Sequence, residues 1–262
     1  MIHPSAIIDP AATLADDVEV GPYAVIDAEV TIGRGTRIGS HVVIRGPTRI
    51  GEGNRIFQFA SVGEDPQDLK YAGERTELVI GDRNRIREFA TINRGTGDGG
   101  GFTKIGNDNL FMAYIHVAHD CIVGDHCIMA NCASLAGHVI LGNHAILGGF
   151  AGVHQFMHVG EHAFIGLNSV VNKDVPPFTL VQGSYATARS INTTGLKRRG
   201  FDDKAIAALR RAYKAMLRGT TDRASAVTSL ADDIEAFPEV RRFVDFIETA
   251  PHGVMRGERK RG

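Results

Sequence analysis

The chain has 262 residues, of which 43% are hydrophobic, so it is long enough to bury a sizeable core. Its formal net charge is −1, which favours neither nucleic acid nor a membrane surface as a partner. The N-terminus lacks a basic segment followed by an apolar one, and no apolar run approaches the roughly 18 residues of a membrane span. We therefore expect a cytoplasmic protein without integral membrane association.

The strongest feature of the sequence is a six-residue repeat. An aliphatic residue occupies every sixth position from Ile8 to Val62, and the series resumes from Ile80 to Ile92 and, shifted by one residue, from Ile105 to Val171 with two larger apolar substitutes. A helix needs apolar spacing near 3.6 and a plain strand near 2, so a period of six fits neither. It is typical of the hexapeptide β-helix, in which three short strands form one triangular coil around an apolar shaft. The sequence therefore predicts a mainly β fold, a β-helix with coils of 18 residues, over residues 1–186.

Two segments interrupt the repeat. The first, residues 63–79, keeps the count but has Asp68 and Glu74 where aliphatic residues belong, so we expect it to leave the shaft. The second, residues 93–104, reads NRGTGDGGGFTK and is rich in glycine. It predicts a protruding loop with one residue more than the repeat requires.

The last part of the chain changes to helical spacing. Asp202 is the predicted N-cap of a helix that ends at Gly219. A second helix is predicted over residues 224–237, and a third begins at Pro238, a residue favoured in the first turn. The closing sequence RGERKRG is basic and predicted to be disordered. We therefore expect a small domain of three helices over residues 187–262.

The three cysteines are Cys121, Cys127 and Cys132. Their number is odd, they lack a CxxC spacing, and the first two occupy the inward small position of the repeat. This pattern favours buried, unreactive thiols over a disulfide or a metal site. No metal and no cofactor is expected.

Eight of the eleven histidines lie within residues 116–162. His119, His138 and His154 follow aliphatic residues that are 18 positions apart, so they belong to three successive coils about 4.8 Å apart. Because the aliphatic positions point into the shaft, we expect these three rings to stack along one outer edge. Three imidazoles on one edge favour a functional site.

His119 is followed directly by Asp120 in the sequence HVAHDC. A carboxylate beside an imidazole can orient the ring and raise its basicity, which suits a general base near neutral pH. The two side chains can meet if the pair lies at a corner of the coil. A backbone N–H such as that of Gly137 could then stabilise an oxyanion, so the pattern predicts acyl transfer.

A zinc-dependent hydratase is an alternative on the same repeat. In γ-class carbonic anhydrases three histidines from adjacent subunits hold the metal. His126 and His162 are two coils apart in this chain, and His158 is close to the second of them.

Several strings are more specific than the repeat. They are SVGEDPQDLKYAGE, IGDRNRIRE, GGGFTKIGNDNLFMAYIHVAHDC, SLAGHV, GVHQFMHVG, DVPPFTLVQG and GLKRRGF. In these the sequence resembles the family of UDP-N-acetylglucosamine acyltransferases, and the resemblance covers essentially the whole chain. It implies a left-handed parallel β-helix, a homotrimer with active sites between subunits, and transfer of a (R)-3-hydroxyacyl group from acyl carrier protein to UDP-GlcNAc as the first step of lipid A synthesis.

The resemblance also implies roles for individual residues. His119 would be the general base, Asp120 its orienting partner and Gly137 the oxyanion donor. Further residues would contact the substrates, the last three at the nucleotide end: Gln67, Asp68, Lys70, His116, His138, His154, Gln155, Asn192, Arg198 and Arg199.

Three positions depart from the family pattern. Thr194 replaces a carboxylate that often contacts the ribose, and Asn93 replaces a histidine that often lies near the sugar. Both leave open an acceptor with a 3-amino group in place of the hydroxyl. Leu167 stands where long-chain members have glycine at the end of the acyl groove. Since a leucine fills the space of several methylenes, we expect a shorter acyl chain.

Three further alternatives use the same repeat. A related N-acyltransferase that acts later in the pathway carries an additional N-terminal domain, whereas this chain enters the repeat at residue 2. A coenzyme-A-dependent acetyltransferase would differ in its donor. A non-enzymatic trimeric scaffold would leave the histidine edge and the segment containing Asp68 and Lys70 unexplained.

Overall fold

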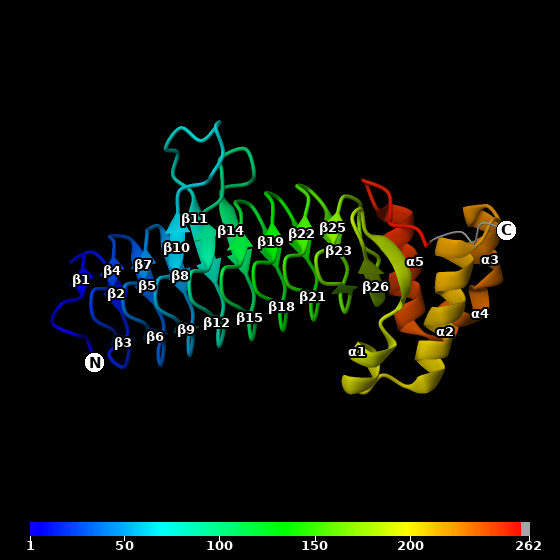
Figure 1. The fold of residues 1–262 in the computed structure, drawn as a ribbon, viewed down its shortest axis with the longest axis horizontal. Helices are drawn as coiled ribbons and strands as arrows, with labels where there is room; N and C mark the ends of the chain where they lie inside the picture. Colours follow the sequence, from blue (N-terminus) through cyan, green and yellow to red (C-terminus); the bar gives the residue numbers. More distant parts are fainter. Residues whose placement is uncertain (258–262) are drawn as a thin grey trace.

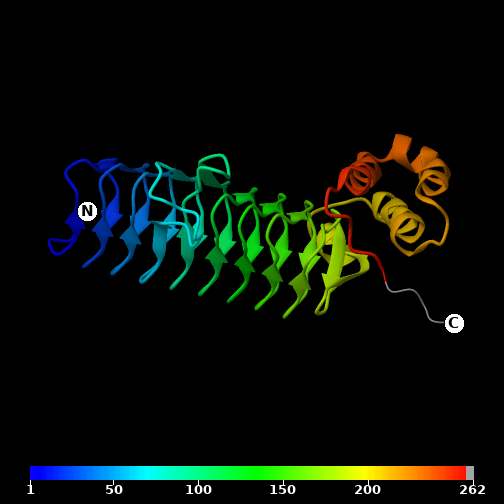
Figure 2. The same ribbon diagram turned by 90° about the horizontal axis from the view of Figure 1, so that it is seen from above.

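The computed structural model describes residues 1–257, and the tail RGERKRG, predicted to be disordered, lies outside them from residue 258 on. A long shaft of short strands leads into a group of helices at the C-terminal end (Figure 1). The view from above shows the same succession, with the helices lying beyond the last coils (Figure 2). The mainly β prediction is confirmed, and the architecture is a left-handed parallel β-helix with a helical C-terminal part.

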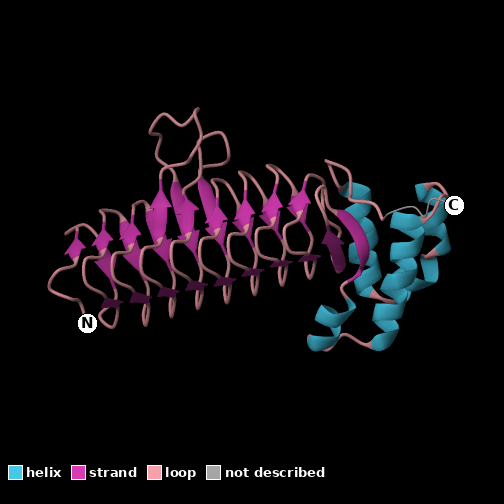
Figure 3. Cartoon of the chain, viewed as in Figure 1, coloured by secondary structure: helices cyan, strands magenta, loops and turns pink. Residues whose placement is uncertain are grey.

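The shaft has three faces, each a sheet whose neighbouring strands come from successive coils (Figure 3). The first sheet contains β1 (Ile7–Ile8), β4 (Val25–Ile26), β7 (Val43–Ile44), β10 (Ser61–Glu64), β13 (Thr91–Asn93), β16 (His116–Val117), β19 (Ser134–Leu135), β22 (Gly152–Val153) and β25 (Val170–Val171). The second contains β2 (Thr13–Leu14), β5 (Val30–Ile32), β8 (Thr48–Ile50), β11 (Glu77–Ile80), β14 (Phe102–Ile105), β17 (Ile122–Val123), β20 (Ile140–Leu141) and β23 (His158–Val159). The third contains β3 (Glu19–Val20), β6 (Arg37–Ile38), β9 (Arg55–Ile56), β12 (Arg85–Ile86), β15 (Leu110–Phe111), β18 (Ile128–Met129), β21 (Ile146–Leu147), β24 (Phe164–Ile165), β26 (Thr179–Gln182) and β27 (Thr187–Ile191).

The aliphatic residues of the repeat fill the shaft. Val62, Ile92 and Leu135 are fully buried, as the period of six requires. Cys121 and Cys127 are buried among them and form no disulfide, as expected. Burial raises the pKa of both thiols to about 12, so neither is a thiolate at neutral pH.

A column of buried polar side chains connects successive coils inside the corner between the second and third sheets. Asn54 Oδ1 accepts a hydrogen bond from Asn84 N at 2.9 Å, and Asn84 Oδ1 accepts one from Asn109 N at 2.9 Å. Thr36 above and Cys127 below continue the column. Each amide satisfies a buried backbone donor of the next coil, so the column fixes the register between coils.

Both interruptions of the repeat leave the shaft, as predicted. Ile80 pairs with Ile50 and with Ile105, so two successive coils contain 30 and 25 residues in place of 18. The extra residues form two loops that project beside each other between β10 and β11 and between β13 and β14 (Figure 1). The second loop therefore adds more than the one residue expected, because residues 94–101, which contain all the glycines of this stretch, lie between the strands.

The C-terminal part is more divided than the sequence indicated. Its elements are α1 (Thr193–Arg198), α2 (Asp203–Tyr213), the π-helical turn η1 (Lys214–Arg218), α3 (Arg223–Ser229), α4 (Ala231–Ala236) and α5 (Pro238–Thr249). Asp202 caps α2 by accepting from Lys204 N, and Pro238 begins α5, as predicted. No described helix has both the length and the apolar character needed to cross a bilayer.

The prediction of one helix over residues 224–237 is wrong. The segment is broken at Leu230, whose φ and ψ of −103° and 6° are not helical and whose side chain is buried. Packing of this residue into the core overrides the continuous helical spacing. The strand β27 and the short helix α1 were not anticipated, and the expected boundary at residues 186/187 falls just before β27, which pairs antiparallel with β26.

His162 lies in a column of stacked rings at the outer side of the corner between the second and third sheets. Its ring centroid is 4.6 Å from that of His144 and 5.6 Å from that of Phe178. The Nδ1 atom of His162 is buried and has no hydrogen-bond partner within residues 1–257. Burial, followed by the nearby charges of His144, Arg199 and Arg242, lowers the pKa of His162 to about 4.

Replacing His162 by phenylalanine is expected to reduce the sensitivity of the fold to acid. An unfolded histidine titrates near pH ~6.5, whereas folded His162 binds a proton only near pH 4. Between these values the unfolded state binds more protons, so the free energy of unfolding falls as pH decreases, by about 2 kcal/mol at pH 5. Urea unfolding at pH 8 and pH 5 should show this loss in the parent and a smaller loss in His162→Phe. Equal losses would contradict the assignment.

Candidate active site

A groove of about 500 Å³ lies on the first sheet, over its last four strands toward the C-terminal end of the shaft. Small residues on strands β16, β19 and β22 and just after them, among them Ala118, Ser134, Ala136 and Gly152, leave space above the sheet. The groove brings together six residues that were singled out from the sequence. They are Gln67, His116, His119, Gly137, His154 and Gln155.

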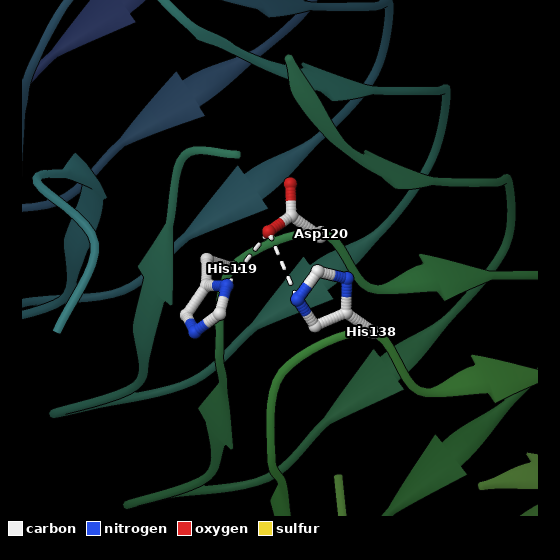
Figure 4. A group of neighbouring side chains, drawn as sticks. All are labelled: His119, Asp120 and His138. Atoms are coloured by element: carbon white, nitrogen blue, oxygen red, sulfur yellow. Dashed lines mark hydrogen bonds and ion pairs between the residues drawn. The ribbon is translucent and has the colours of Figure 1, made fainter. Parts of the chain in front are cut away.

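His119 and Asp120 form a hydrogen-bonded pair beside this groove (Figure 4). His119 Nδ1 lies 2.7 Å from Asp120 Oδ2, and both residues are buried. Adjacent residues of a strand point to opposite faces, but Asp120 has a φ of 60° at the corner between the first and second sheets. The corner therefore turns its carboxylate back toward the ring. Since the carboxylate can only accept, His119 Nδ1 donates and its Nε2 carries the free lone pair.

The expected stacking of His119, His138 and His154 is wrong. Residues 18 apart lie above one another, so the column containing His138 is Asp120, His138 and Phe156, with a His138–Phe156 centroid distance of 4.5 Å. His138 meets His119 edge to face at 5.2 Å, and His138 Nε2 is 3.6 Å from Asp120 Oδ2. His154 occupies a different position of its hexad and enters the groove separately. His119 therefore contacts His138 and shares the groove with His154, although the three rings do not stack in one column.

Gly137 lies directly beneath the imidazole of His119. A Cβ atom at this position would be 2.6 Å from His119 Cε1 and 2.8 Å from Nε2, so only glycine leaves room for the ring. The N–H of Gly137 has no hydrogen-bond partner among the residues that the structure describes. A free backbone donor therefore lies next to the basic nitrogen.

His116 lies on the same sheet, one coil before Ser134. His116 Nδ1 and Thr91 Oγ1 are hydrogen-bonded at 2.8 Å, which fixes the ring. Burial, and to a smaller extent the charge of His119, lowers the pKa of His116, so this ring is neutral at physiological pH.

The two projecting loops contain contacts that the sequence did not predict. Arg94 is buried and donates to the Gly63 carbonyl, the Asp65 carboxylate and Tyr71 Oη, so it holds the first loop in place. Thr96 of the second loop donates to Asp120 through its backbone and its hydroxyl. In the sequence, Arg94 and Thr96 stand out only as an arginine and a threonine within a glycine-rich segment, which does not indicate their partners.

Asp68 and Lys70 lie in the first loop, around a small hollow of about 290 Å³. The hollow is closed on its other side by Thr96, Gly97 and Asp98 of the second loop. Asp68 and Lys70 do not line the main groove. They share the hollow with Thr96, which is hydrogen-bonded to Asp120 of the His119–Asp120 pair.

Asn93 has a structural role in the same region. Its Nδ2 donates to the Asp65 carbonyl at 2.7 Å and to the Glu64 carbonyl at 3.3 Å. The side chain is buried, so its amide is directed at the backbone of the first loop.

The residues expected at the nucleotide end lie elsewhere. Asn192 and Arg198 line a cavity of about 610 Å³ between the third sheet and the helices, and Thr194 lies there too. Asn192 also caps α1, since its Oδ1 accepts from Gly195 N and its Nδ2 donates to the His162 carbonyl. The same cavity is strongly cationic. Its basic residues are Arg189, Arg198, Arg210, Lys214 and Arg218.

Arg199 points away from this cavity. Its guanidinium donates to the His144 carbonyl at 3.1 Å, and burial lowers its pKa. The structure therefore places Arg198 and Arg199 in different environments, although the resemblance implied that both lie at the nucleotide end.

Within one chain, the histidines of the alternative zinc site do not converge. His126 and His162 are separated by His144 in one column of nearly parallel rings, with centroid distances of 4.8 and 4.6 Å. His158 lies on β23 and faces His252. A tetrahedral zinc site needs nitrogen atoms aimed at one point, which parallel stacked rings do not provide. Within the described residues, potential ligand atoms cluster at His119, Asp120 and His138, where the carboxylate already accepts several hydrogen bonds.

Leu167 lies at the corner between the third and first sheets. Its side chain is 65% exposed, and it precedes Asn168, which has a φ of 53°. It is not part of the groove wall within one chain, but the following strand β25 contributes Val170 to the end of the groove.

Comparison with known proteins agrees with this geometry. Residues 174–255 match the family model for domain 2 of UDP N-acetylglucosamine O-acyltransferase, and residues 102–137 match the bacterial transferase hexapeptide model. The acyl-[acyl-carrier-protein]–UDP-N-acetylglucosamine O-acyltransferase of Stenotrophomonas maltophilia is 54% identical over 97% of both chains. That of Thiobacillus denitrificans is 54% identical over 97% of this chain and 99% of its own.

A solved structure resembles the chain over nearly its whole length. LpxA from Acinetobacter baumannii superposes with a TM-score of 0.94 at 46% identity, covering 97% of this chain and 99% of that one. The resemblance inferred from the motifs is thereby confirmed. Since both the shaft and the helical part are matched at this identity, the chain is an acyltransferase that belongs to the UDP-N-acetylglucosamine O-acyltransferase family.

Proposed function

We propose that the protein transfers a (R)-3-hydroxyacyl group from acyl carrier protein to the 3-position of UDP-GlcNAc, the first step of lipid A biosynthesis. The observation that carries this proposal is the buried His119–Asp120 pair with the free N–H of Gly137 beside it at an open groove. No cofactor is needed for this reaction, because a base and an oxyanion donor suffice for acyl transfer. A cytoplasmic location remains a prediction.

The reaction can be written with these three residues. His119 Nε2 takes the proton from the acceptor 3-hydroxyl, and the hydroxyl oxygen attacks the thioester carbonyl carbon. The negative charge on the carbonyl oxygen is stabilised by the Gly137 N–H. Collapse breaks the carbon–sulfur bond, and the imidazolium returns the proton to the thiolate of the carrier. Asp120 holds the Nδ1–H tautomer and stabilises the transient imidazolium.

The acyl chain fits the floor of the groove. From Gly137 the small residues Ser134 and Gly152 lead along the first sheet toward Val170. Each further coil adds about 4.8 Å of length along the shaft. We infer that the acyl chain lies along this line, so that its end approaches the corner where Leu167 is located.

A homotrimer would unite the two separated groups of substrate residues. The corner between the third and first sheets carries an aromatic column of Tyr23, His41, Phe59, Phe89 and Tyr114, whose neighbouring rings are 4.8–5.1 Å apart. Its tyrosines and phenylalanines are 42–61% exposed. A continuous exposed apolar surface of this kind is rare on a monomeric protein and marks an interaction site. With these corners on a three-fold axis, the first sheet of one subunit would face the third sheet of the next. The groove and the cationic cavity would then form one site.

The cationic cavity suits the nucleotide. Two phosphates carry negative charge that arginine guanidinium groups bind in a bidentate manner. Arg198 and Arg210 are the residues of the cavity that we assign to the pyrophosphate, and Thr194 occupies the position for the ribose. Asp68 and Lys70 are assigned to the glucosamine.

A product assay tests the proposed function. The protein is incubated with (R)-3-hydroxyacyl carrier protein and either UDP-GlcNAc or its 3-amino analogue, and products are identified by mass spectrometry. We expect an acylated sugar nucleotide, with the ester or amide product reporting the acceptor. The same assay with acetyl-coenzyme A should give no product. Absence of product in all arms would refute the proposal. Hydration of carbon dioxide that EDTA inhibits and zinc restores would favour the hydratase alternative.

A further inference from the structure

Asp120 accepts three hydrogen bonds from two different parts of the chain. Its Oδ2 accepts from His119 Nδ1 at 2.7 Å and from Thr96 Oγ1 at 2.7 Å. Its Oδ1 accepts from Thr96 N at 2.8 Å. Thr96 is 4% exposed and Asp120 is 5% exposed, so water does not compete for these oxygens. One threonine therefore contacts both oxygens of the carboxylate.

The loop that contains Thr96 is in turn held by Glu74 of the first loop. Glu74 Oε1 accepts from Gly97 N at 3.0 Å, and its Oε2 accepts from Ala72 N at 2.9 Å. These backbone donors, Gly97 first, lower the pKa of Glu74, so it is ionised at neutral pH. A chain of hydrogen bonds thus leads from the loop with Asp68 and Lys70 to the His119–Asp120 pair.

The carboxylate has a competing partner if this support is lost. His138 Nε2 lies 3.6 Å from the same oxygen, Oδ2, that His119 contacts. A carboxylate held only by its own side-chain torsions could turn toward either ring. The second loop also passes directly over it, because a Cβ atom on Gly99 would lie 2.0–2.3 Å from the carboxylate atoms. The loop therefore both orients the carboxylate and covers it.

We propose that Thr96 is a positioning residue that directs Asp120 toward His119, and that Glu74 holds the backbone of Thr96 in place for this role. The inference rests on the proposed function of His119 as general base. It assigns to the second loop a part in proton transfer, in addition to closing the hollow around Asp68 and Lys70.

Thr96→Val tests the first part, since valine keeps the shape and the backbone donor but removes the hydroxyl. Because a hydrogen bond to a charged group is among the stronger ones in proteins, kcat should fall roughly tenfold or more while KM for UDP-GlcNAc changes less than about twofold. With Oδ2 free to turn toward His138, the imidazolium of His119 is less stabilised. The acid limb of the pH profile of kcat/KM should therefore move to lower pH. Thr96→Ser should restore both values.

Thr76→Val is the matched control. Thr76 is also a buried threonine near the first loop, but its Oγ1 has no hydrogen-bond partner within residues 1–257. Loss of this hydroxyl should leave kcat and the pH profile unchanged. The structural effect of burying a valine in this region is thereby separated from the effect on Asp120.

Glu74→Gln tests the second part. A glutamine amide can accept one of the two backbone hydrogen bonds but not both, so kcat should fall, and Thr96→Val should reduce it little further in the double variant. Independent, multiplicative effects would remove Glu74 from the proposal. If Thr96→Val has the kcat and pH profile of the parent while His119→Ala is inactive, the positioning role is refuted and the proposed function stands. If His119→Ala is active, the proposed function itself fails.

Discussion

His119→Ala is expected to reduce kcat by roughly 10² to 10⁴ while the fold persists. The ring is the group in the groove that has both a free nitrogen and a carboxylate partner at 2.7 Å. Without it, the acceptor hydroxyl must lose its proton to water in the transition state. Steady-state rates with saturating acyl carrier thioester and UDP-GlcNAc measure the effect.

Two controls accompany this variant. His3→Ala replaces an exposed histidine at the other end of the shaft and should retain parental kcat. Circular dichroism and the molecular mass in solution should be the same for both variants. Parental turnover in His119→Ala would remove this residue from the role of base and would leave the groove without an evident catalytic group.

Leu167→Gly is expected to shift the donor preference toward longer acyl chains. Leu167 lies at the exposed corner beside β25, where the proposed path of the acyl chain ends. Removing its side chain frees space for several methylenes, and each buried methylene contributes about 0.8 kcal/mol. This corresponds to roughly a fourfold change in kcat/KM per methylene. Competition between carrier thioesters of different length, read by mass spectrometry, measures the preference.

Leu167→Met keeps the volume at this corner and serves as the matched control. It should retain the parental preference. If Leu167→Gly also retains it, the acyl chain ends elsewhere. Val170, which closes the groove within one chain, would then be the residue to change next.

Most of the fold could be predicted from the sequence because its determinants are periodic. An aliphatic residue at every sixth position fixes the inward side of each strand, and Asp202 and Pro238 mark helix starts by local chemistry. The break at Leu230 could not be predicted, because it depends on packing against distant residues. The strand β27 was missed because it lies outside the six-residue repeat and forms by pairing with β26.

The site was predicted in part. Pairing of His119 with Asp120 follows from a coil corner, whereas the groove residues Gln67, His116 and Gln155 came only from the family resemblance. The stack of three histidines was wrong because positions within the hexad were not matched to one another. The contacts of Arg94 and Thr96 could not be predicted, since irregular loops have no period from which spatial neighbours can be calculated.

The asparagine column inside the shaft has a consequence for how this enzyme can diversify. Asn54, Asn84 and Asn109 connect the coils immediately before and after both projecting loops. Whatever the length of a loop, the chain returns to the shaft at a position that an asparagine hydrogen bond fixes, so every later strand keeps its place. With the proposed assignment of Asp68 and Lys70 to the glucosamine, recognition of the acceptor sugar would be modular: exchange of an entire loop would alter which sugar is acylated without disturbing the residues several coils away.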